Sequence, residues 1–251
     1  MLSDIDLSNL LLIAKEAALQ AGKFLLESKS NILQVDSEAG KDIKIRSDME
    51  SEAIILDHLK RESEFSILSE ESGMFEGKDH RLIWIVDPLD GSLNYFRGIP
   101  LCCISIGLWQ EDKPVAGIVY DFNRTEIFAG IDGEGAWLNG ERIAVSSIPD
   151  KEKAALCTGF PANTDFSTES LMAFVQKVRE YKKVRLLGSA ALSLAYVAAG
   201  RADAYMENDI MLWDVAAGIA LVKASGGLVH YTSTGRENAF RVQASNRSLA
   251  S

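Results

Sequence analysis

The chain has 251 residues, of which 47% are hydrophobic and 25% are charged, and its formal net charge is −10 at pH 7. These fractions are ordinary for a globular protein, and the length accommodates one large core or two modest ones. The negative charge argues against nucleic acid or an anionic membrane as a main partner, because both require basic patches on the protein.

The sequence favours a cytoplasmic enzyme. It contains no run of about 18 apolar residues, the length that marks a membrane span. Asp4 and Asp6 stand where a secretory signal peptide carries basic residues. Cys102 and Cys103 are adjacent and Cys157 is alone, which implies buried, reduced thiols rather than a disulfide framework.

The first part of the chain alternates helical and strand patterns. Leu10, Ala14, Ala17, Ala21 and Phe24 keep helical spacing and predict an amphipathic first helix. The segment Ser47-Asp48-Met49-Glu50 has the pattern of a capping box, which predicts a second helix with Ser47 as its N-cap and an end near Arg61. Strands are predicted near 65–69, 82–87, 103–109, 115–121 and 126–130.

Past about Pro149 the pattern becomes a regular alternation of strands and helices. We therefore predict an α+β lobe over residues 1–149 and an α/β lobe over 150–251. The second lobe has predicted helices at 167–180, 189–199 and 214–225, and predicted strands near 154–158, 184–187, 203–206, 227–231 and 240–244.

The segment from Trp84 to Tyr95 carries the strongest chemical signal. Asp87 and Asp90 lie at the exit of a predicted buried strand that stops at Pro88, and a sharp turn there lets both acids face one cation. Gly91 and Ser92 then offer backbone N–H groups at the start of a possible short helix, which is an anion site. Hard-cation ligands next to a phosphate cradle indicate metal-assisted hydrolysis of a phosphate ester.

Two further acidic positions lie at the ends of predicted elements. Glu70 and Glu71 follow a predicted strand, and Asp214 is placed as the N-cap of an apolar helix. Each acid taken alone has a plainer explanation: a solvated loop pair, the cap of a turn, or, for Asp48, a charge that complements a helix dipole. Their joint order along the chain is what favours a common site.

Other chemistries have little support. His58, His80 and His230 are scattered and lack the paired spacing of zinc ligands. The sequence contains no Gly-x-Ser-x-Gly nucleophile elbow, no dinucleotide fingerprint and no P-loop lysine.

The motifs Glu70-Glu71, Asp87-Pro88-Leu89-Asp90-Gly91-Ser92 and Trp213-Asp214 together resemble the inositol monophosphatase family of Mg²⁺-dependent, lithium-sensitive sugar phosphatases. The resemblance covers nearly the whole chain, from Lys41 to Gly227. It implies a two-lobed, layered α-β-α-β-α sandwich with the site between the lobes, phosphoric monoester hydrolase activity and a homodimer.

The resemblance also implies roles for single residues. The expected ligands of two or three Mg²⁺ ions are the side chains of Glu70, Asp87, Asp90 and Asp214 and the carbonyl of Leu89. Ser92 and Asp48 are expected to orient and deprotonate the attacking water, with Glu70 beside it. Helix N-termini at Gly91-Ser92, at 188–190 and at Asp214 are expected to converge on the phosphate. The expected substrate contacts are Asp90, Gly91, Ser92, Ala190, Glu207 and Asp214.

Two residues limit the range of candidate substrates. Leu93 stands where adenosine 3′,5′-bisphosphate phosphatases carry a basic residue, and Glu207 matches the carboxylate that accepts hydroxyl hydrogen bonds from inositol in the family. Both favour a monophosphate such as inositol 1-phosphate. Fructose 1,6-bisphosphate, adenosine 3′,5′-bisphosphate and histidinol phosphate stay open, as does a noncatalytic protein-binding role. Two features depart from the family pattern: Ile45 stands where many members have threonine, and the lysine often found upstream has no clear equivalent unless Lys41 substitutes for it. Both bear on a third, weakly held metal ion, on the affinity for Mg²⁺ and on lithium sensitivity.

Overall fold

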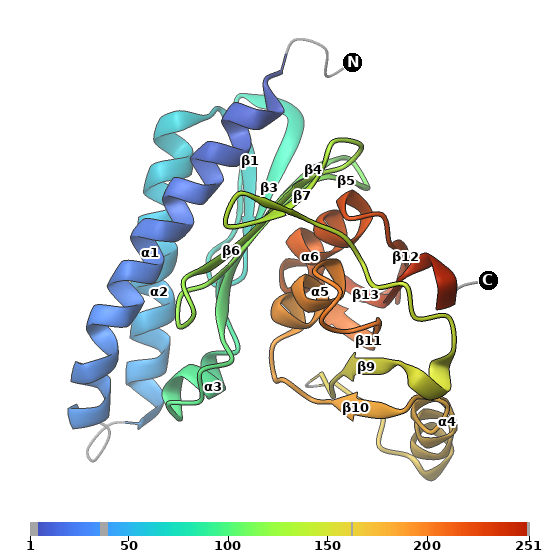
Figure 1. Ribbon diagram of the computed structural model, residues 1–251. Helices are drawn as coiled ribbons and strands as arrows, with labels where there is room; N and C mark the ends of the chain where they lie inside the picture. The colour runs from blue at the N-terminus through green and yellow to red at the C-terminus, as the bar shows by residue number, and fades with distance from the viewer. Residues whose placement is uncertain (1–4, 36–39, 162, 250–251) are drawn as a thin grey trace.

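Two long helices, α1 (Leu7–Val35) and α2 (Gly40–Glu62), lie side by side over one face of a large sheet (Figure 1). The structure is a computed structural model that describes residues 5–35, 40–161 and 163–249, with side chains left undescribed at 29–45. Helix α1 buries a stripe of mostly small residues at helical spacing, so it packs closely on the sheet. A Cβ atom on Gly22 would lie 2.4 Å from Cε1 of Tyr120, which shows how closely helix and strand approach.

The prediction that Ser47 caps the second helix is wrong. Helix α2 begins at Gly40, and Ser47 lies inside it with a buried side chain. The carboxylate of Glu50 accepts a hydrogen bond from Nε of Arg46 at 2.7 Å. An i,i+4 pair of this kind supports a continuing helix, whereas a capping box would begin one.

The large sheet has eight strands in the order β2-β1-β3-β4-β5-β6-β7-β8. Strands β1 and β3 are parallel, and the other neighbours are antiparallel. The five strands predicted for this half are present, and the short β2, β7 and β8 were not anticipated. The bounds are β1 Phe65–Ser69, β2 Gly73–Phe75, β3 Asp79–Asp90, β4 Cys103–Gln110, β5 Lys113–Asp121, β6 Glu126–Ile131, β7 Gly135–Leu138 and β8 Glu141–Ile143.

The prediction that this strand stops at Pro88 is wrong, because β3 continues to Asp90. Asp87 pairs with Ser105 and Asp90 with Cys103, so two residues of β3 lie opposite one residue of β4. This irregularity is a β-bulge, and a bulge accommodates Pro88 because proline has no N–H to donate to the ladder. The bulge, rather than a strand end, positions the two acids.

The second sheet has five strands in the order β10-β9-β11-β13-β12. Its strands match the predicted ones, except that β11 runs well past residue 206 and contains an irregularity between Glu207 and Ile210. The strands are β9 Ala155–Thr158, β10 Lys183–Arg185, β11 Ala204–Met211, β12 Leu228–Ser233 and β13 Ala239–Ser245; the helices of the later chain are α3 Ser92–Phe96, α4 Thr168–Val178, α5 Ala190–Ala198 and α6 Leu212–Ala224.

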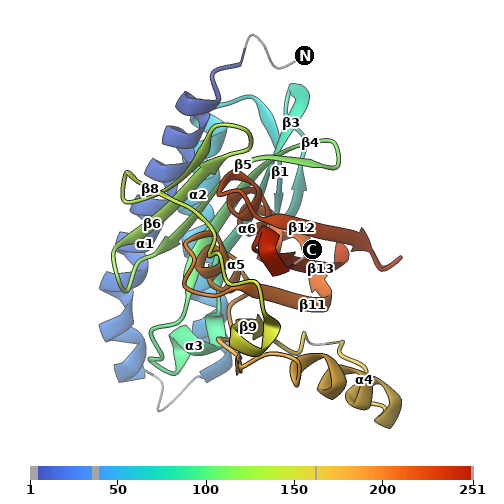
Figure 2. The ribbon, with the colours of Figure 1, turned by 45° about the vertical axis from the view of Figure 1, so that its right-hand side comes forward.

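Helices α5 and α6 lie between the two sheets, as both views show (Figures 1 and 2). Gly117 of β5 lets α6 approach closely, because a Cβ atom there would lie 2.5 Å from the carbonyl oxygen of Ala217. One core cluster joins α1 and α2 to the large sheet, and another joins both sheets through α5 and α6. The second core contains residues from both sides of residue 149, so it does not divide the chain at that point. The lobe boundary at 149 therefore stays a prediction.

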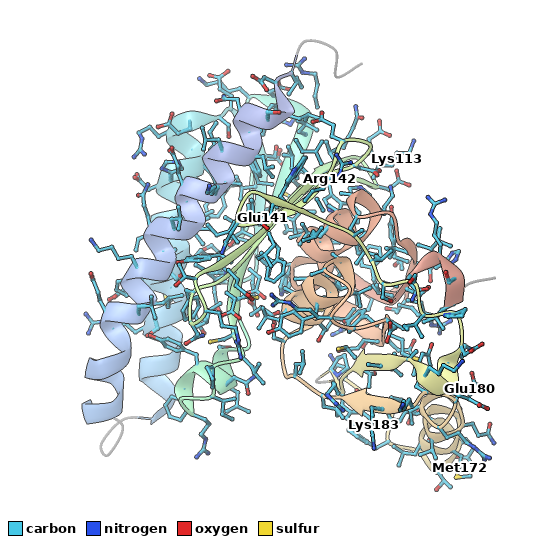
Figure 3. The ribbon with its side chains drawn as sticks, in the orientation of Figure 1. Lys113, Glu141, Arg142, Met172, Glu180 and Lys183 are labelled. Atoms are coloured by element: carbon cyan, nitrogen blue, oxygen red, sulfur yellow. The ribbon has the colours of Figure 1, made fainter. Side chains whose placement is uncertain are left out.

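Helix α4 forms the outermost layer, on the side of the molecule opposite α1 and α2. Met172, labelled in Figure 3, lies on this helix and is 54% exposed. The order of layers is therefore α-β-α-β-α, as the sequence predicted. None of the helices within the described residues combines the length and hydropathy that crossing a membrane requires.

Candidate active site

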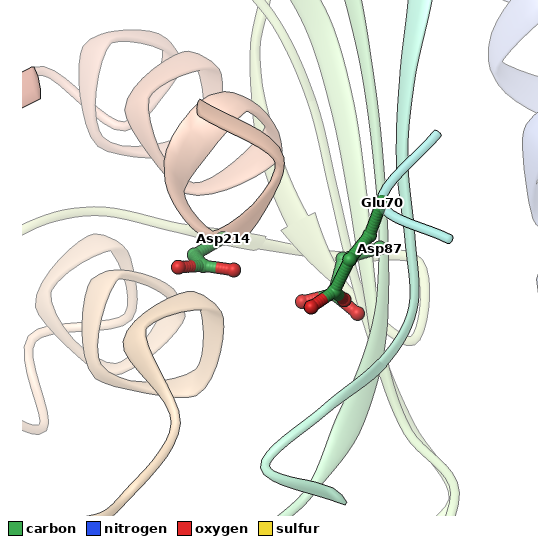
Figure 4. A group of neighbouring side chains, drawn as sticks. All are labelled: Glu70, Asp87 and Asp214. Atoms are coloured by element: carbon green, nitrogen blue, oxygen red, sulfur yellow. The ribbon is translucent and has the colours of Figure 1, made fainter. Parts of the chain in front are cut away.

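Three carboxylates from separate elements converge where the two sheets meet the start of α6. Glu70, Asp87 and Asp214 each place one oxygen so that these atoms lie within 4.8 Å of one another (Figure 4). Glu70 directly follows β1, and its N–H donates to the carbonyl of Val86 at 3.1 Å. Since β1 and β3 are parallel neighbours, their carboxyl ends lie at the same edge, which places Glu70 beside Asp87.

Asp87 is buried inside the β3 bulge. Its Oδ1 accepts a 2.9 Å hydrogen bond from the N–H of Leu89, which orients the side chain within the bulge. Burial raises the pKa of Asp87 well above its ordinary value, and the charges of Glu70, Asp90 and Asp214 raise it further. Negative charge is therefore crowded at this point and favours binding of a proton or a cation.

Asp90, at the end of the same bulge, contacts the start of α5. Its Oδ2 accepts hydrogen bonds from the hydroxyl of Ser189 at 2.6 Å and from the N–H of Ala191 at 2.7 Å. Burial raises the pKa of Asp90 to about 6, although these hydrogen bonds lower it. Asp90 is thus held by residues from the other half of the chain.

Asp214 is not the N-cap of its helix, contrary to the prediction. Helix α6 begins at Leu212 with Met211 as N-cap, so Asp214 is in the first turn. The N–H of Leu212 donates to the carbonyl of Asn238 at 2.8 Å, which anchors the helix start two residues earlier. The pKa of Asp214 is raised well above its ordinary value, first by burial and then by Asp90 and Glu70.

The acids open onto a cavity of about 220 Å³. Gly91, the N-cap of α3, has φ 84°, a left-handed conformation that favours glycine. Ser189 caps α5, and the first N–H groups of that helix bind side-chain oxygens at the cavity wall: Ala191 donates to Asp90 and Leu192 to Ser189. The lining residues are Glu70, Asp87, Leu89, Asp90, Gly91, Ser92, Gly159, Phe160, Pro161, Gly188, Ser189, Ala190, Glu207, Ile210 and Asp214.

Glu207 reaches the cavity from β11. Gly159 lies directly against it, since a Cβ atom there would be 2.6 Å from Oε1 of Glu207. Burial and the nearby charge of Asp90 raise the pKa of Glu207 to about 8. A carboxyl group from the second sheet therefore lines the cavity together with the acids of the first.

The chemistry of the donor set fits a hard divalent cation. Carboxylate and carbonyl oxygens are the ligands that Mg²⁺ prefers, and a bound cation would relieve the crowding that raises the pKa values of Asp87 and Asp214. A sequence model of the inositol monophosphatase family matches residues 6–250. The chain belongs to the inositol monophosphatase family.

Individual relatives agree with this assignment. The inositol-1-monophosphatase of Synechocystis sp. is 40% identical over 231 residues, which cover 90% of this chain and 80% of the relative. The Nus factor SuhB of Xylella fastidiosa is 40% identical over 221 residues, 86% of this chain and 80% of the relative. The solved inositol monophosphatase of Anabaena (Nostoc) sp. superposes with a TM-score of 0.83 at 36% identity, covering 96% of this chain and 92% of that one.

In this inositol monophosphatase family protein, the cavity brings together the predicted site residues except Asp48. Asp48 is buried in α2, and its charge acts on Tyr95 of α3, the helix that Ser92 begins. Its pairing with Ser92 stays a prediction. The side chains of Lys41 and Ile45 lie outside the described part of the chain.

Several lining residues were missed by sequence reasoning. The turn at 188–190 was expected near the phosphate, but the role of the Ser189 side chain as N-cap was not predicted, although Ser189 precedes an apolar helical run. Gly159 to Pro161 follow a predicted strand with a turn signal. Ile210 has no local signal, because only the irregularity in β11 turns it toward the cavity.

Proposed function

We propose that this protein is a Mg²⁺-dependent phosphomonoester hydrolase acting on a small polyol or sugar phosphate, with inositol 1-phosphate as the first candidate. The observation that carries the proposal is the convergence of Glu70, Asp87 and Asp214 within 4.8 Å. The same cavity is lined by Gly91, Ser92 and the capped start of α5. Cation ligands and anion-binding N–H groups thus share one small space.

Glu70, Asp87, Asp90, Asp214 and the Leu89 carbonyl would hold two or three Mg²⁺ ions. When bound, Mg²⁺ lowers the pKa of coordinated water and neutralises charge on the phosphate. The short separation of Glu70, Asp87 and Asp214 supports these three carboxylates as members of one ligand set. Family membership supports the choice of Mg²⁺.

The remaining groups act on the water and the phosphate. The Ser92 hydroxyl, paired with Asp48, orients the attacking water and takes its proton, with Glu70 beside it. Backbone N–H groups at 91–92 donate to phosphate oxygens, and the start of α5 faces the phosphate with its partial positive charge. Their partial positive charge supports this assignment, since it favours an anion at a helix N-terminus.

Glu207 selects the alcohol part of the substrate. A carboxylate accepts hydrogen bonds from neighbouring hydroxyl groups and repels a second phosphate, so a polyol monophosphate is favoured. Arg97, Lys183 and Arg185 are the basic residues that would have to offset Glu207 for a bisphosphate.

A panel of phosphate esters tests the proposal. Phosphate release with Mg²⁺ would be measured from inositol 1-phosphate, fructose 1,6-bisphosphate, adenosine 3′,5′-bisphosphate, histidinol phosphate and NADP, using wild type, Asp90→Asn and Glu207→Gln. We expect a preference for inositol phosphate that Glu207→Gln weakens, and loss of turnover in Asp90→Asn. Preference for a bisphosphate would overturn the substrate and leave the metal site standing. No release from any ester would overturn the reaction.

A protein-binding role is the second candidate. It is favoured by relatives that carry the name Nus factor SuhB at up to 40% identity. The expectation that nucleic acid is not a main partner, which rests on the negative net charge, also stays a prediction. If binding of a protein partner is unchanged by Asp87→Asn in a protein that hydrolyses nothing, this second role is the correct one.

We further propose that the protein is a homodimer and is inhibited by lithium, as the family resemblance implies. Sedimentation would give the mass in solution against the 27.4 kDa of one chain. A monovalent cation that occupies a Mg²⁺ site should lower turnover, and unchanged activity at tens of millimolar Li⁺ would contradict this.

A further inference from the structure

Helix α2 holds both acid-bearing segments through two adjacent, buried residues. The hydroxyl of Ser51 donates to the carbonyl of Pro88 at 2.9 Å, inside the β3 bulge. The next residue, Glu52, is 3% exposed and reaches the segment after β1. Neither residue lines the cavity, so neither has a role in the chemistry described above.

The carboxylate of Glu52 accepts three hydrogen bonds. Its Oε1 accepts from the hydroxyl of Ser69 and from the N–H of Ser72, the latter at 3.1 Å, and its Oε2 accepts from the hydroxyl of Ser72. Among described residues Glu52 forms no ion pair, so these three donors are what stabilise its buried charge. A buried carboxylate used in this way acts as a clamp on backbone and hydroxyl groups.

Glu70 lies between the two clamped residues. Its own N–H is bonded to Val86, which fixes the start of the segment, and the Glu52 bonds to Ser69 and Ser72 fix it on both sides. Glu70 is itself exposed, in contrast to the buried Asp87. The carboxyl group of Glu70 interacts with Asp87, and how well it reaches Asp87 depends on where the backbone of residues 69–72 places it.

We propose that Glu52 is a positioning residue that fixes the Ser69–Ser72 segment and thereby holds Glu70 at the distance from Asp87 and Asp214 that cation binding requires. The inference rests on the proposed function only in that Glu70 is taken as a cation ligand. Loss of the clamp should weaken Mg²⁺ binding even though Glu52 touches neither cation nor substrate.

Two substitutions separate geometry from charge. Glu52→Ala removes both acceptor oxygens and with them all three hydrogen bonds, and it should raise the Mg²⁺ concentration at half saturation about 10- to 100-fold, the usual cost of losing a residue that orients a metal ligand. Glu52→Gln keeps an acceptor oxygen for Ser69 and the Ser72 N–H, and its amide donates to the Ser72 hydroxyl, which can rotate to accept. Glu52→Gln should therefore keep most of the wild-type affinity for Mg²⁺.

Mg²⁺ binding is measured directly by calorimetry without substrate, together with the rise in melting temperature that Mg²⁺ produces. Ser63→Ala is the matched control, because the Ser63 hydroxyl also ties the α2 region to β3: it donates to the Leu59 carbonyl and accepts from the Trp84 indole at 3.0 Å. It should lower the melting temperature of the metal-free protein and leave Mg²⁺ affinity unchanged. If Glu52→Ala does not fold, Ser72→Ala removes one clamp bond and should weaken affinity in the same direction.

Wild-type Mg²⁺ affinity in Glu52→Ala, or an equal loss in Ser63→Ala, would overturn the inference. Failure of Glu52→Gln to restore affinity would show that charge, not position, is what Glu52 supplies, and would also overturn it. If the wild type binds Mg²⁺ yet hydrolyses none of the esters, the proposed function fails while the Glu52 comparison still decides the positioning role.

Discussion

The hydroxyl of Ser189 donates a 2.6 Å hydrogen bond to Oδ2 of Asp90, a residue 99 positions earlier in the chain. The same hydroxyl accepts from the N–H of Leu192 at 3.2 Å and caps α5. One side chain therefore joins the start of a helix from the second half to the bulge of β3. The position of Asp90 is therefore fixed by residues from both halves of the chain.

Replacing Ser189 with alanine should remove both interactions. We expect the free energy of unfolding to fall by roughly 2–3 kcal/mol, the sum of a lost helix cap and a lost hydrogen bond to a carboxylate. Urea denaturation measures it. Ser189→Thr keeps the hydroxyl and should lose much less. Ser193→Ala is the control on the same helix, because the Ser193 hydroxyl bonds the carbonyl of Ser189 and the thiol of Cys157, both within the second half of the chain; an equal loss there would refute the bridging role.

Asp87→Asn should stabilise the metal-free protein. Glu70, Asp90 and Asp214 all raise the pKa of Asp87, which means that its negative charge is unfavourable in the folded state without a cation. The variant should melt at a higher temperature than wild type in EDTA and should lose the rise that Mg²⁺ gives the wild type. Asp57→Asn, at an exposed position paired with Arg61, is the control. A lower melting temperature of Asp87→Asn in EDTA would contradict the electrostatic account.

Glu207 should make the stability of the metal-free protein depend on pH. Its pKa is about 8 in the folded state against an ordinary value of 4.5, so the folded state binds the proton more tightly than the unfolded state. The corresponding stability is fully present below about pH 4.5 and is lost as pH rises through about 8. In EDTA, Glu207→Gln should thus gain stability relative to wild type between pH 5 and pH 8. A difference that does not change over this range would be the contrary result.

Ser92 should need only its hydroxyl. If it orients the attacking water, Ser92→Ala should lower turnover by about 10²- to 10⁴-fold, the usual contribution of positioned proton transfer, with a much smaller change in the Michaelis constant. Ser92→Thr should retain most activity. Steady-state phosphate release measures both. Near-normal turnover in Ser92→Ala would rule out the water-activating role.

Sequence reasoning anticipated most helices and strands because apolar periodicity is a local property. The stripe from Leu10 to Phe24 and the apolar run of α6 show their pattern within a few turns. The ends of elements were less predictable. Ser47 and Asp214 both stand in sequence patterns typical of N-caps, yet both helices start earlier. For α6, the bond from Leu212 to Asn238 anchors the earlier start.

The sequence by itself determined the identity of the acids and the resemblance to the family, because the types and order of residues in Asp87-Pro88-Leu89-Asp90-Gly91-Ser92 and Trp213-Asp214 suffice for these. The layered fold was an expectation that this resemblance implied. Only the tertiary structure decided how the acids meet. The β3 bulge, the bond from Ser189 to Asp90 and the clamp of Glu52 on Ser69 and Ser72 each join segments that are distant or out of register. No local pattern encodes such contacts, since they depend on packing two sheets and the helices between them around one core.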